Sequence, residues 1–393
     1  MKDSQDKQEN IKIEGEQGKK YNLNKVVRIT IFAALITILI LMLFLSKAEL
    51  VKINEEMKKI KIGYLLIAML ILLINFFIRP ITLVILSRIE KLPIRKREVY
   101  LINLTEPFFD GVTPFATGGQ PFEIYAMTRL KVKGSQATSL LMINLIITMI
   151  ATDVVALLSL IYAKHFLVSL PVATQVLAIL GFLFLFFVLG FFISIGVSNK
   201  LKLFIIKIIL LFGKIKVFSK LIERKKEGII QFMDQLQASF KTMFSNVKIV
   251  VISILIKIIT LLVYYTIPLF IIKALSIDYD KSQIFIIVAA TAFVTSVVTW
   301  IPTPGSSGGI EYFFREILFV NILGSTLVVG STGMLLWRLI TYYFLMSVGF
   351  IAYVVLELQY SKYLKTRKNN LINIENNCQA EEQNMQNKEN ICD

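Results

Sequence analysis

The sequence predicts an all-α protein: a polytopic membrane helix bundle with two re-entrant or broken helical hairpins in pseudo-repeated halves. Hydrophobic residues make up 55% of the 393-residue chain, and the mean hydropathy of +0.68 is above that of ordinary globular proteins. Several apolar stretches approach the roughly 20 residues that cross a hydrocarbon core of about 30 Å. The basic residues behind the net charge of +16 cluster between these stretches, as in cytoplasmic loops of membrane proteins.

Six stretches are interpreted as complete spans: 29–45, 63–87, 138–162, 174–198, 249–275 and 330–357. The first follows a Lys-bearing tail and precedes no small-residue cleavage site, so we expect a retained span rather than a signal peptide. The second is interrupted by Arg79-Pro80, and we expect Arg79, near a helix end, to reach the interface by snorkelling. Two further apolar regions, about 100–130 and 283–325, are broken in the middle by Pro and Gly.

These elements divide the chain into five predicted parts. They are a cytoplasmic tail at 1–27, a first membrane half at 28–198, a basic amphipathic linker at 199–248, a second membrane half at 249–358 and a cytoplasmic tail at 359–393. In the linker, Leu203, Ile206 and Leu210 recur at helical spacing among lysines, which indicates an interfacial helix. The last tail is rich in Asn, Gln and Glu and is expected to be disordered.

The basic clusters predict the orientation in a bacterial-type plasma membrane. They lie at Arg95–Arg97, within Lys200–Lys248 and at Lys362–Lys368, which places these segments and both termini in the cytoplasm. The loop 47–61 is expected outside, although it also carries several lysines, partly balanced by glutamates.

Several other functions are not supported by the residues. The two cysteines, Cys378 and Cys392, lie in the polar tail, and the single histidine, His165, lies at a predicted span end, so no metal or cofactor is expected. No nucleotide-binding loop occurs, which argues against ATP-driven pumping, and the distribution of charge argues against nucleic acid as a partner.

The two broken regions share a motif. Residues 113–119 read Thr-Pro-Phe-Ala-Thr-Gly-Gly, and residues 303–309 read Thr-Pro-Gly-Ser-Ser-Gly-Gly. Glu123 and Glu311 follow at different offsets. Extramembrane turns would also use Thr-Pro and Gly-Gly, but both motifs lie inside apolar regions.

Pro and Gly-Gly predict that the helices break at these motifs. Broken backbone at membrane depth is tolerated only inside protein or beside a wet cavity. N–H groups at the start of the following half-helix attract anions, and paired broken helices indicate a transporter's binding site.

Charged residues inside the spans provide a second signal. Asp153, Lys257 and Arg338 lie in predicted spans, where charges are expensive and face a cavity or a partner. Arg338 lies among aromatic and hydroxyl residues and suits forked recognition of a phosphate, whereas Lys257 could snorkel. Glu311 and Arg315 are four residues apart and lie on one helix face. They could therefore form an ion pair that only stabilises the helix packing, which is the alternative to a role in binding.

The sequence resembles the lysylphosphatidylglycerol synthase membrane-domain family, also called flippase-like. The matching segments are Thr113–Tyr125, Ile301–Glu311 and Leu336–Tyr343, and the resemblance extends over roughly residues 28 to 358. It implies a bundle with re-entrant helices around a lipid-sized cavity. In bifunctional relatives this domain is thought to move an aminoacylated lipid, and a soluble acyltransferase-like domain makes that lipid from lysyl-tRNA. Only a polar tail follows Leu356 here, so we expect the transport activity rather than the synthase activity.

The leading hypothesis is therefore a flippase or transporter for a phosphate-bearing lipid. The headgroup is expected between the two hairpins, with its phosphate near the hairpin N–H groups and Arg338, and any amine toward Glu123, Glu311 or Asp153. The candidate substrate-binding residues are Thr113, Pro114, Thr117, Gly118, Gly119, Glu123, Tyr125, Asp153, Thr303, Pro304, Ser306, Ser307, Gly308, Gly309, Glu311, Arg315, Arg338 and Tyr342.

The identity of the lipid stays open. Lysyl- or alanyl-phosphatidylglycerol, phosphatidylglycerol and a polyprenyl phosphate all fit, as do a homo-oligomer or a separate synthase as partner. The alternative functions are a phosphatidylglycerol lysyltransferase and an accessory protein of envelope polymer synthesis.

Overall fold

The computed structural model describes residues 47–113, 116–168, 171–212, 216–298, 301 and 303–362. The predicted tail 1–27, the predicted first span at 29–45, Pro114 and most of the predicted tail 359–393 lie outside the described residues. Every regular element of the described part is helical, which confirms the all-α fold class.

Six helices in the described part are long and apolar enough to cross a membrane: Ile62–Ile89, Gly134–Ile161, Gln175–Val197, Val247–Ala274, Lys281–Val298 and Leu327–Lys362. Five of them coincide with predicted spans. The remaining one, Lys281–Val298, is the first arm of the predicted second broken region, so that arm alone has the length of a span. The membrane-spanning character of the chain is thereby confirmed.

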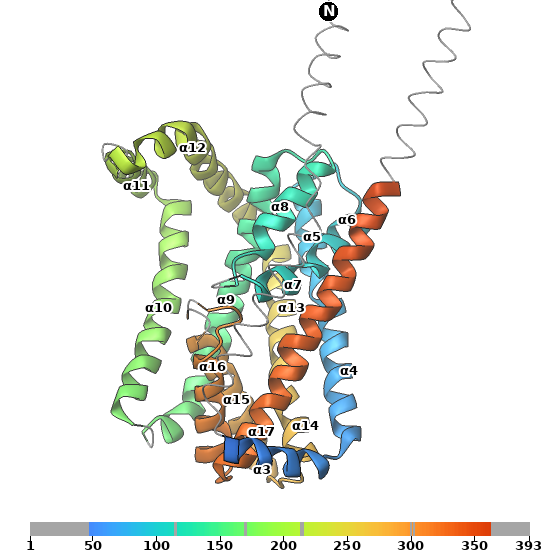
Figure 1. Ribbon diagram of the computed structural model, residues 1–393. Coiled ribbons are helices and arrows are strands. Elements are labelled where there is room, and N and C mark those ends of the chain that lie inside the picture. The colour runs from blue at the N-terminus through green and yellow to red at the C-terminus, as the bar shows by residue number, and fades with distance from the viewer. Residues whose placement is uncertain are drawn as a thin grey trace, which may run out of the picture.

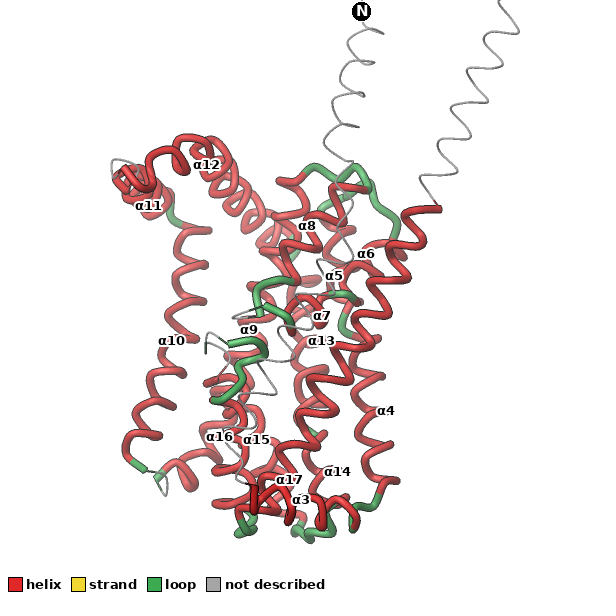
Figure 2. The backbone as a smooth tube through the Cα atoms, viewed as in Figure 1, coloured by secondary structure: helices red, strands yellow, loops and turns green. Residues whose placement is uncertain are grey.

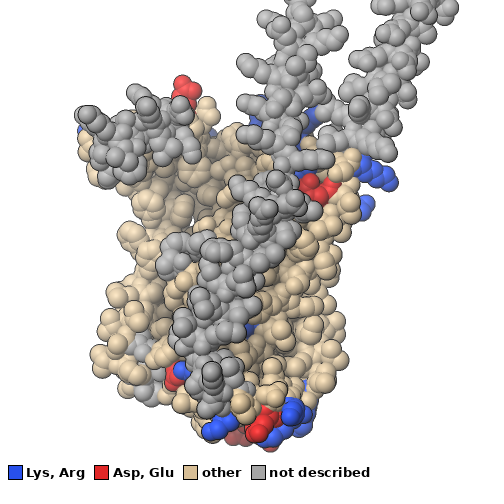
Figure 3. All heavy atoms as spheres, viewed as in Figure 1, with Lys and Arg blue, Asp and Glu red and all other residues tan. Residues whose placement is uncertain are grey.

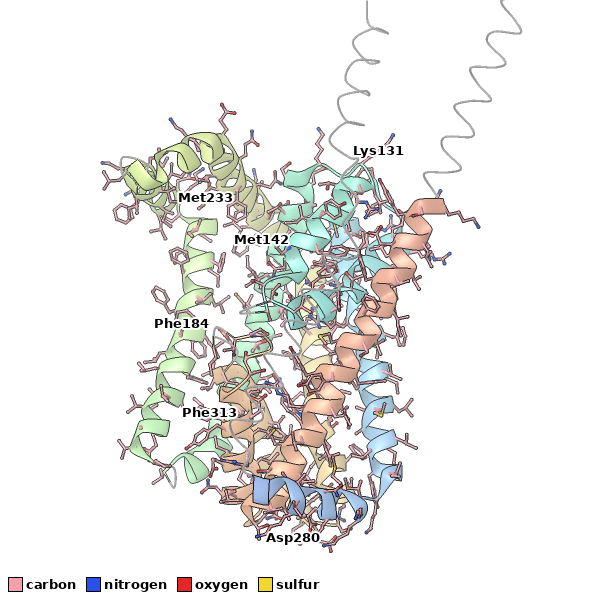
Figure 4. The ribbon with its side chains drawn as sticks, in the orientation of Figure 1. Lys131, Met142, Phe184, Met233, Asp280 and Phe313 are labelled. Atoms are coloured by element: carbon pink, nitrogen blue, oxygen red, sulfur yellow. The ribbon has the colours of Figure 1, made fainter. Side chains whose placement is uncertain are left out.

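The successive long helices run between two ends of the bundle, which Figure 4 marks with Lys131 at one end and Asp280 at the other. Helices α4 (Ile62–Ile78) and α5 (Pro80–Ile89) lead toward the Lys131 end, and α9 (Gly134–Leu167) returns to the Asp280 end (Figure 1). Helix α10 (Val172–Val197) leads up again, and α13 (Val247–Tyr265) and α14 (Ile267–Ala274) lead down. The final helix begins as α17 (Leu327–Arg338) and η2 (Leu339–Phe344) at the Asp280 end and continues to Lys362.

The two broken regions approach the middle of the bundle from opposite ends. Helices α6 (Lys96–Leu104), α7 (Glu106–Gly111) and α8 (Gly119–Arg129) occupy the half near Lys131, whereas α15 (Lys281–Val298), α16 (Gly309–Phe313) and η1 (Phe314–Ile322) occupy the half near Asp280 (Figure 1). Figure 2 shows loop backbone midway along the bundle, where these helices end. Their insertion into the membrane as re-entrant hairpins stays a prediction.

Each broken region is packed in its own apolar core. In one, Phe109 stacks on Phe122 with ring centroids 3.9 Å apart. In the other, Phe314 stacks on Trp337 at 4.4 Å. Aromatic burial of this kind holds short helices that would be unstable alone, because their length provides few internal hydrogen bonds.

The remaining helices lie at the ends of the bundle. Helix α3 (Lys47–Lys58) lies at the Asp280 end, and α11 (Asn199–Phe212) and α12 (Lys216–Ser245) lie at the other end beyond α10 (Figure 1). Helix α11 exposes Leu203 while Lys202 forms an ion pair with Asp234 at 2.9 Å. On the face seen in Figure 3, most Lys, Arg, Asp and Glu atoms lie near the two ends, as expected if the middle faces lipid.

Arg79 does not lie near a helix end, contrary to the sequence prediction. Its backbone N–H donates to Asn75 O at 3.0 Å, and Pro80 occupies the first turn of α5, where its missing N–H is tolerated. The chain therefore continues as a helix through Arg79 to Ile89, and Arg79 stays inside the span.

Candidate functional site

The second motif is clamped by a buried ion pair. Arg338 Nε donates to Glu311 Oε1 at 2.6 Å, and both side chains are almost completely buried. The guanidinium also donates to Gly305 O at 2.9 Å, while Glu311 Oε2 accepts from Gly308 N at 2.6 Å. The two charges thus stabilise the irregular backbone of the motif between them.

Hydroxyl groups complete the second motif. Thr303 Oγ1 donates to Ser307 O at 2.7 Å, and Ser307 Oγ donates to Pro304 O at 2.8 Å. Gly305, Ser306 and Gly308 all have positive φ angles, so the segment makes a tight turn before α16. These hydroxyls are used to hold the turn.

The first motif is closed in a similar way, with different residues. Thr113 Oγ1 accepts from Gly118 N at 2.8 Å and donates to Phe109 O at 2.9 Å, and Asp110 Oδ1 accepts from Gly119 N at 2.8 Å. A Cβ on Gly119 would lie 2.6 Å from Glu106 Cγ, so glycine is needed for this approach. The N–H groups of Gly118, Gly119 and Gly308 donate within the protein, and their role in binding an anion stays a prediction.

Tyr342 joins the two broken regions. Its hydroxyl donates to Gly111 O of the first region at 2.7 Å. Its ring covers Gly305 of the second region, where an added Cβ would lie 2.3 Å from Tyr342 Cε2. One turn earlier on the same helix, Arg338 binds Gly305 O, so a single helix contacts both motifs.

A group of acidic residues lies beside the first motif. Glu106 forms an ion pair with Arg79 at 2.9 Å. Asn103 Nδ2 donates to Glu106 Oε2 at 2.9 Å and to Glu123 Oε1 at 2.7 Å. Asp110 interacts electrostatically with Glu106 and Arg79. We call Glu106, Asp110 and Glu123 the acidic cluster.

A cavity of about 270 Å³ adjoins this cluster. Its lining residues are Leu72, Asn75, Phe76, Arg79, Thr148, Lys257, Thr260, Leu261, Tyr264 and Leu345, from four separate long helices. Arg79 lies ten residues before Ile89, and Lys257 lies ten residues after Val247, so each is about 15 Å from the Lys131 end of its helix. The two cations therefore lie at about the same level of the bundle, measured from the Lys131 end.

Lys257 is the unusual residue of this cavity. The residue is only 5% exposed, and within the described ranges no hydrogen bond or ion pair holds its ammonium group. It interacts electrostatically with Arg79, Glu106 and Glu123. A buried ammonium without a direct counter-ion marks a place where an anion would be stabilised.

The comparison with known families agrees with this architecture. The family described as "Lysylphosphatidylglycerol synthase TM region" matches residues 29–349, which is most of the chain. The chain belongs to this family. A search of curated proteins and a search of solved structures found no match.

Within this family member, the predicted site residues do not form one group. The larger group lies around the second motif and consists of Thr303, Pro304, Ser306, Ser307, Gly308, Gly309, Glu311, Arg338 and Tyr342. The smaller group lies around the first motif and consists of Thr113, Gly118, Gly119 and Glu123. Thr117 is exposed beside them, and Pro114 lies outside the described residues.

Three predicted residues lie elsewhere. The pairing of Glu311 with Arg315 is not formed, because Glu311 binds Arg338 and Arg315 binds Glu316 at 2.9 Å. Tyr125 lies under the Arg129 guanidinium, 5.3 Å from it, and does not line the cavity. Asp153 is buried in α9, where its Oδ2 atom has no hydrogen-bond partner within the described part, and it does not line the cavity either.

Sequence reasoning missed Arg79, Asn103, Glu106 and Asp110 as site residues. The sequence contained a signal for Arg79, because apolar residues flank it on both sides within one predicted span. It is too far from either end of that helix for its side chain to reach water easily. Glu106 and Asp110 lie in the apolar region before the first motif. They precede the Gly-Gly pair, whereas the predicted carboxylates Glu123 and Glu311 follow their Gly-Gly pairs.

Proposed function

We propose that this protein moves a phosphate-bearing lipid across the membrane, with the lipid headgroup bound in the cavity between Arg79 and Lys257. The observation that carries the proposal is the buried ammonium of Lys257, at the same depth as Arg79 and beside empty space of about 270 Å³. Two cations at one depth, with an intervening space, suit a phosphodiester anion.

The other lining residues support a lipid rather than a soluble anion. Asn75, Thr260 and Tyr264 offer polar atoms, while Leu72, Phe76, Leu261 and Leu345 are apolar. Polar groups at the centre of the membrane lower the cost of bringing a headgroup there, and apolar walls accept acyl chains. The two broken regions meet beside this level and provide irregular backbone that can rearrange.

This proposal revises the place of the phosphate. Arg338, which the sequence suggested as its partner, is occupied by Glu311 and Gly305 O. The amine of an aminoacylated lipid would meet Glu106 and Glu123, because Glu311 is paired and Asp153 lies away from the cavity. Lysyl- or alanyl-phosphatidylglycerol, phosphatidylglycerol and polyprenyl phosphates all carry the required anion.

The test measures lipid movement in proteoliposomes. The rate is obtained from the quenching of NBD-labelled phosphatidylglycerol by dithionite. We expect Lys257→Gln to slow movement by about tenfold or more, because a charge-assisted contact to the phosphate is lost. The matched control is Lys248→Gln, which removes an exposed lysine from the same helix and should keep the wild-type rate. Equal rates for wild type, Lys257→Gln and empty liposomes would contradict the proposal.

The family description names a synthase, which keeps a phosphatidylglycerol lysyltransferase as the second candidate. Its test is the transfer of radiolabelled lysine from lysyl-tRNA to phosphatidylglycerol by the purified chain alone. Labelled lipid in that assay would favour synthesis, and unlabelled lipid together with transport would favour the carrier.

A further inference from the structure

The acidic cluster holds two carboxylates unusually close together. Glu106 Oε2 and Glu123 Oε1 accept hydrogen bonds from the same nitrogen, Asn103 Nδ2, at 2.9 and 2.7 Å. The two oxygens are therefore no more than about 6 Å apart, in a buried site where like charges repel strongly. Glu123 is 1% exposed, so water does little to screen the repulsion.

The charges around this pair do not balance. The charged groups that interact with it are Arg79 from the α4–α5 junction, Lys257 from α13 and Asp110 from α7. Tyr264 of α13 interacts with Arg79. With every Asp, Glu, Lys and Arg ionised, three carboxylates face two cations. A phosphodiester in the cavity would add a further negative charge, so binding an anion there is opposed unless a carboxylate becomes neutral.

Two unpartnered atoms point to ligands of opposite charge at this place. The buried ammonium of Lys257 faces the cavity without a direct counter-ion, which favours an anion. Asn103 is 2% exposed, and its Oδ1 atom has no hydrogen-bond partner in the part of the chain that the structure describes. A buried acceptor without a donor favours an added proton beside it, because a protonated carboxyl can donate a hydrogen bond and an ionised carboxylate cannot.

We propose that the lipid phosphate and one proton bind together, the phosphate at Arg79 and Lys257 and the proton at the Glu106–Glu123 pair. This inference rests on the proposed function. A hydronium ion of the solvent gives its proton to one carboxylate oxygen, so that one O–H bond of hydronium breaks as the carboxyl O–H bond forms. The proton returns to water when the lipid leaves. The proton neutralises the charge that the phosphate brings. A headgroup that carries its own ammonium needs no such proton.

The coupling of lipid binding to proton uptake predicts the direction in which the lipid affinity changes with pH. If binding takes up one proton, a higher pH weakens binding, and the apparent affinity falls by up to about tenfold per pH unit where the pair is ionised in the free protein. At low pH, where the pair already holds its proton, the affinity becomes independent of pH.

The test is calorimetric titration of the full chain in detergent with dihexanoyl-phosphatidylglycerol, in two buffers of different ionisation enthalpy. The buffer dependence of the binding enthalpy measures protons taken up per lipid. We expect close to one proton for wild type and for the control Asp280→Asn, which removes an exposed carboxylate at the far end of the bundle. We expect close to none for Glu123→Gln, whose binding should also lose its pH dependence.

The possible failures can be told apart. Wild-type binding without proton uptake and without pH dependence overturns the coupling, and it leaves the proposed function standing if Lys257→Gln still weakens binding. Undiminished proton uptake by Glu123→Gln also overturns it. Absence of any lipid binding by wild type overturns both proposals. If Glu123→Gln does not fold, the wild-type buffer pair alone still decides.

Discussion

At the scale of single residues, the main finding concerns Arg338. Its surroundings of aromatic and hydroxyl groups suggested a phosphate-binding residue, but Arg338 is 3% exposed, and its guanidinium is bonded to Glu311 and Gly305 O. A buried ion pair repays its desolvation only when the remaining donors and acceptors are also satisfied. Here the backbone of the motif satisfies them, so the pair maintains the turn.

This interpretation predicts a large loss of stability for Arg338→Ala. Glu311 would be left as a buried carboxylate without its cation, and breaking a buried pair in this way costs about 3–5 kcal/mol. The measurement is the free energy of unfolding in mixed micelles titrated with sodium dodecyl sulfate.

The control variant is Lys59→Ala, which breaks the exposed pair with Glu56 and should change the free energy of unfolding little. Equal losses for the two variants would show that Arg338 has no special structural role. Adding Glu311→Leu to Arg338→Ala should recover part of the stability, because the unpaired charge is then removed.

At the scale of helices, the last span acts as the common support of both broken regions. It carries Arg338 and, one turn later, Tyr342, which binds Gly111 O and covers Gly305. Directly after Arg338 the helix becomes π-helical over Leu339–Phe344, a segment that includes Tyr342, and π-helical turns inside long helices are frequent at functional sites. A movement of one broken region would therefore change the contacts of the other, because Tyr342 contacts both.

Two glycines allow this contact to be tested. Gly305 and Gly324 both have φ of +59°, but only Gly305 has a neighbour in the way, since an added Cβ on Gly324 would meet nothing within 4 Å. Gly324→Ala should cost about 1–2 kcal/mol from backbone strain alone. Gly305→Ala should cost clearly more, because Tyr342 must leave its place over the motif.

The same unfolding titration measures both variants. Equal losses would mean that the Tyr342 ring moves aside without cost. Tyr342→Phe gives the complementary measurement, since it removes the hydroxyl that donates to Gly111 O and keeps the ring over Gly305.

At the scale of the whole molecule, the direction in which each long helix runs decides at which end of the bundle each loop lies. The loops that contain Arg95–Arg97 and Lys131 lie at one end of the bundle, and the loop that contains Asp280 lies at the other (Figures 1 and 4). The excess of positive charge at the Lys131 end predicts that this end faces the cytoplasm.

Single cysteines test this orientation, because the two native ones are easily removed. In a Cys378→Ser, Cys392→Ser background, Asp280→Cys should react with a membrane-impermeant maleimide in intact cells, and Lys131→Cys should react only after the cells are opened. The reverse pattern would show that the orientation is opposite to the one proposed. Labelling of both positions in intact cells would contradict the prediction that they lie on opposite sides of the membrane.

Much of the architecture could be predicted from sequence. Five of the predicted spans coincide with long helices because hydropathy over about 20 residues is a local property, and Pro with Gly-Gly stops a helix whatever surrounds it. The resemblance based on short segments around the two motifs is confirmed by the match of the family to residues 29–349. The predicted domain boundaries and the use of the motifs in binding stay predictions.

The site could be predicted only in part, for a different reason. The sequence by itself determined which residues carry charge into the apolar regions, including Lys257, Glu311 and Arg338, because charge is a property of the residue. Only the tertiary structure decided their partners. Arg338 pairs with Glu311 across 27 residues, Tyr342 reaches Gly111 across 231, and Arg79 joins Lys257 beside one cavity. Such pairings depend on which helices pack together, and no local pattern contains that information.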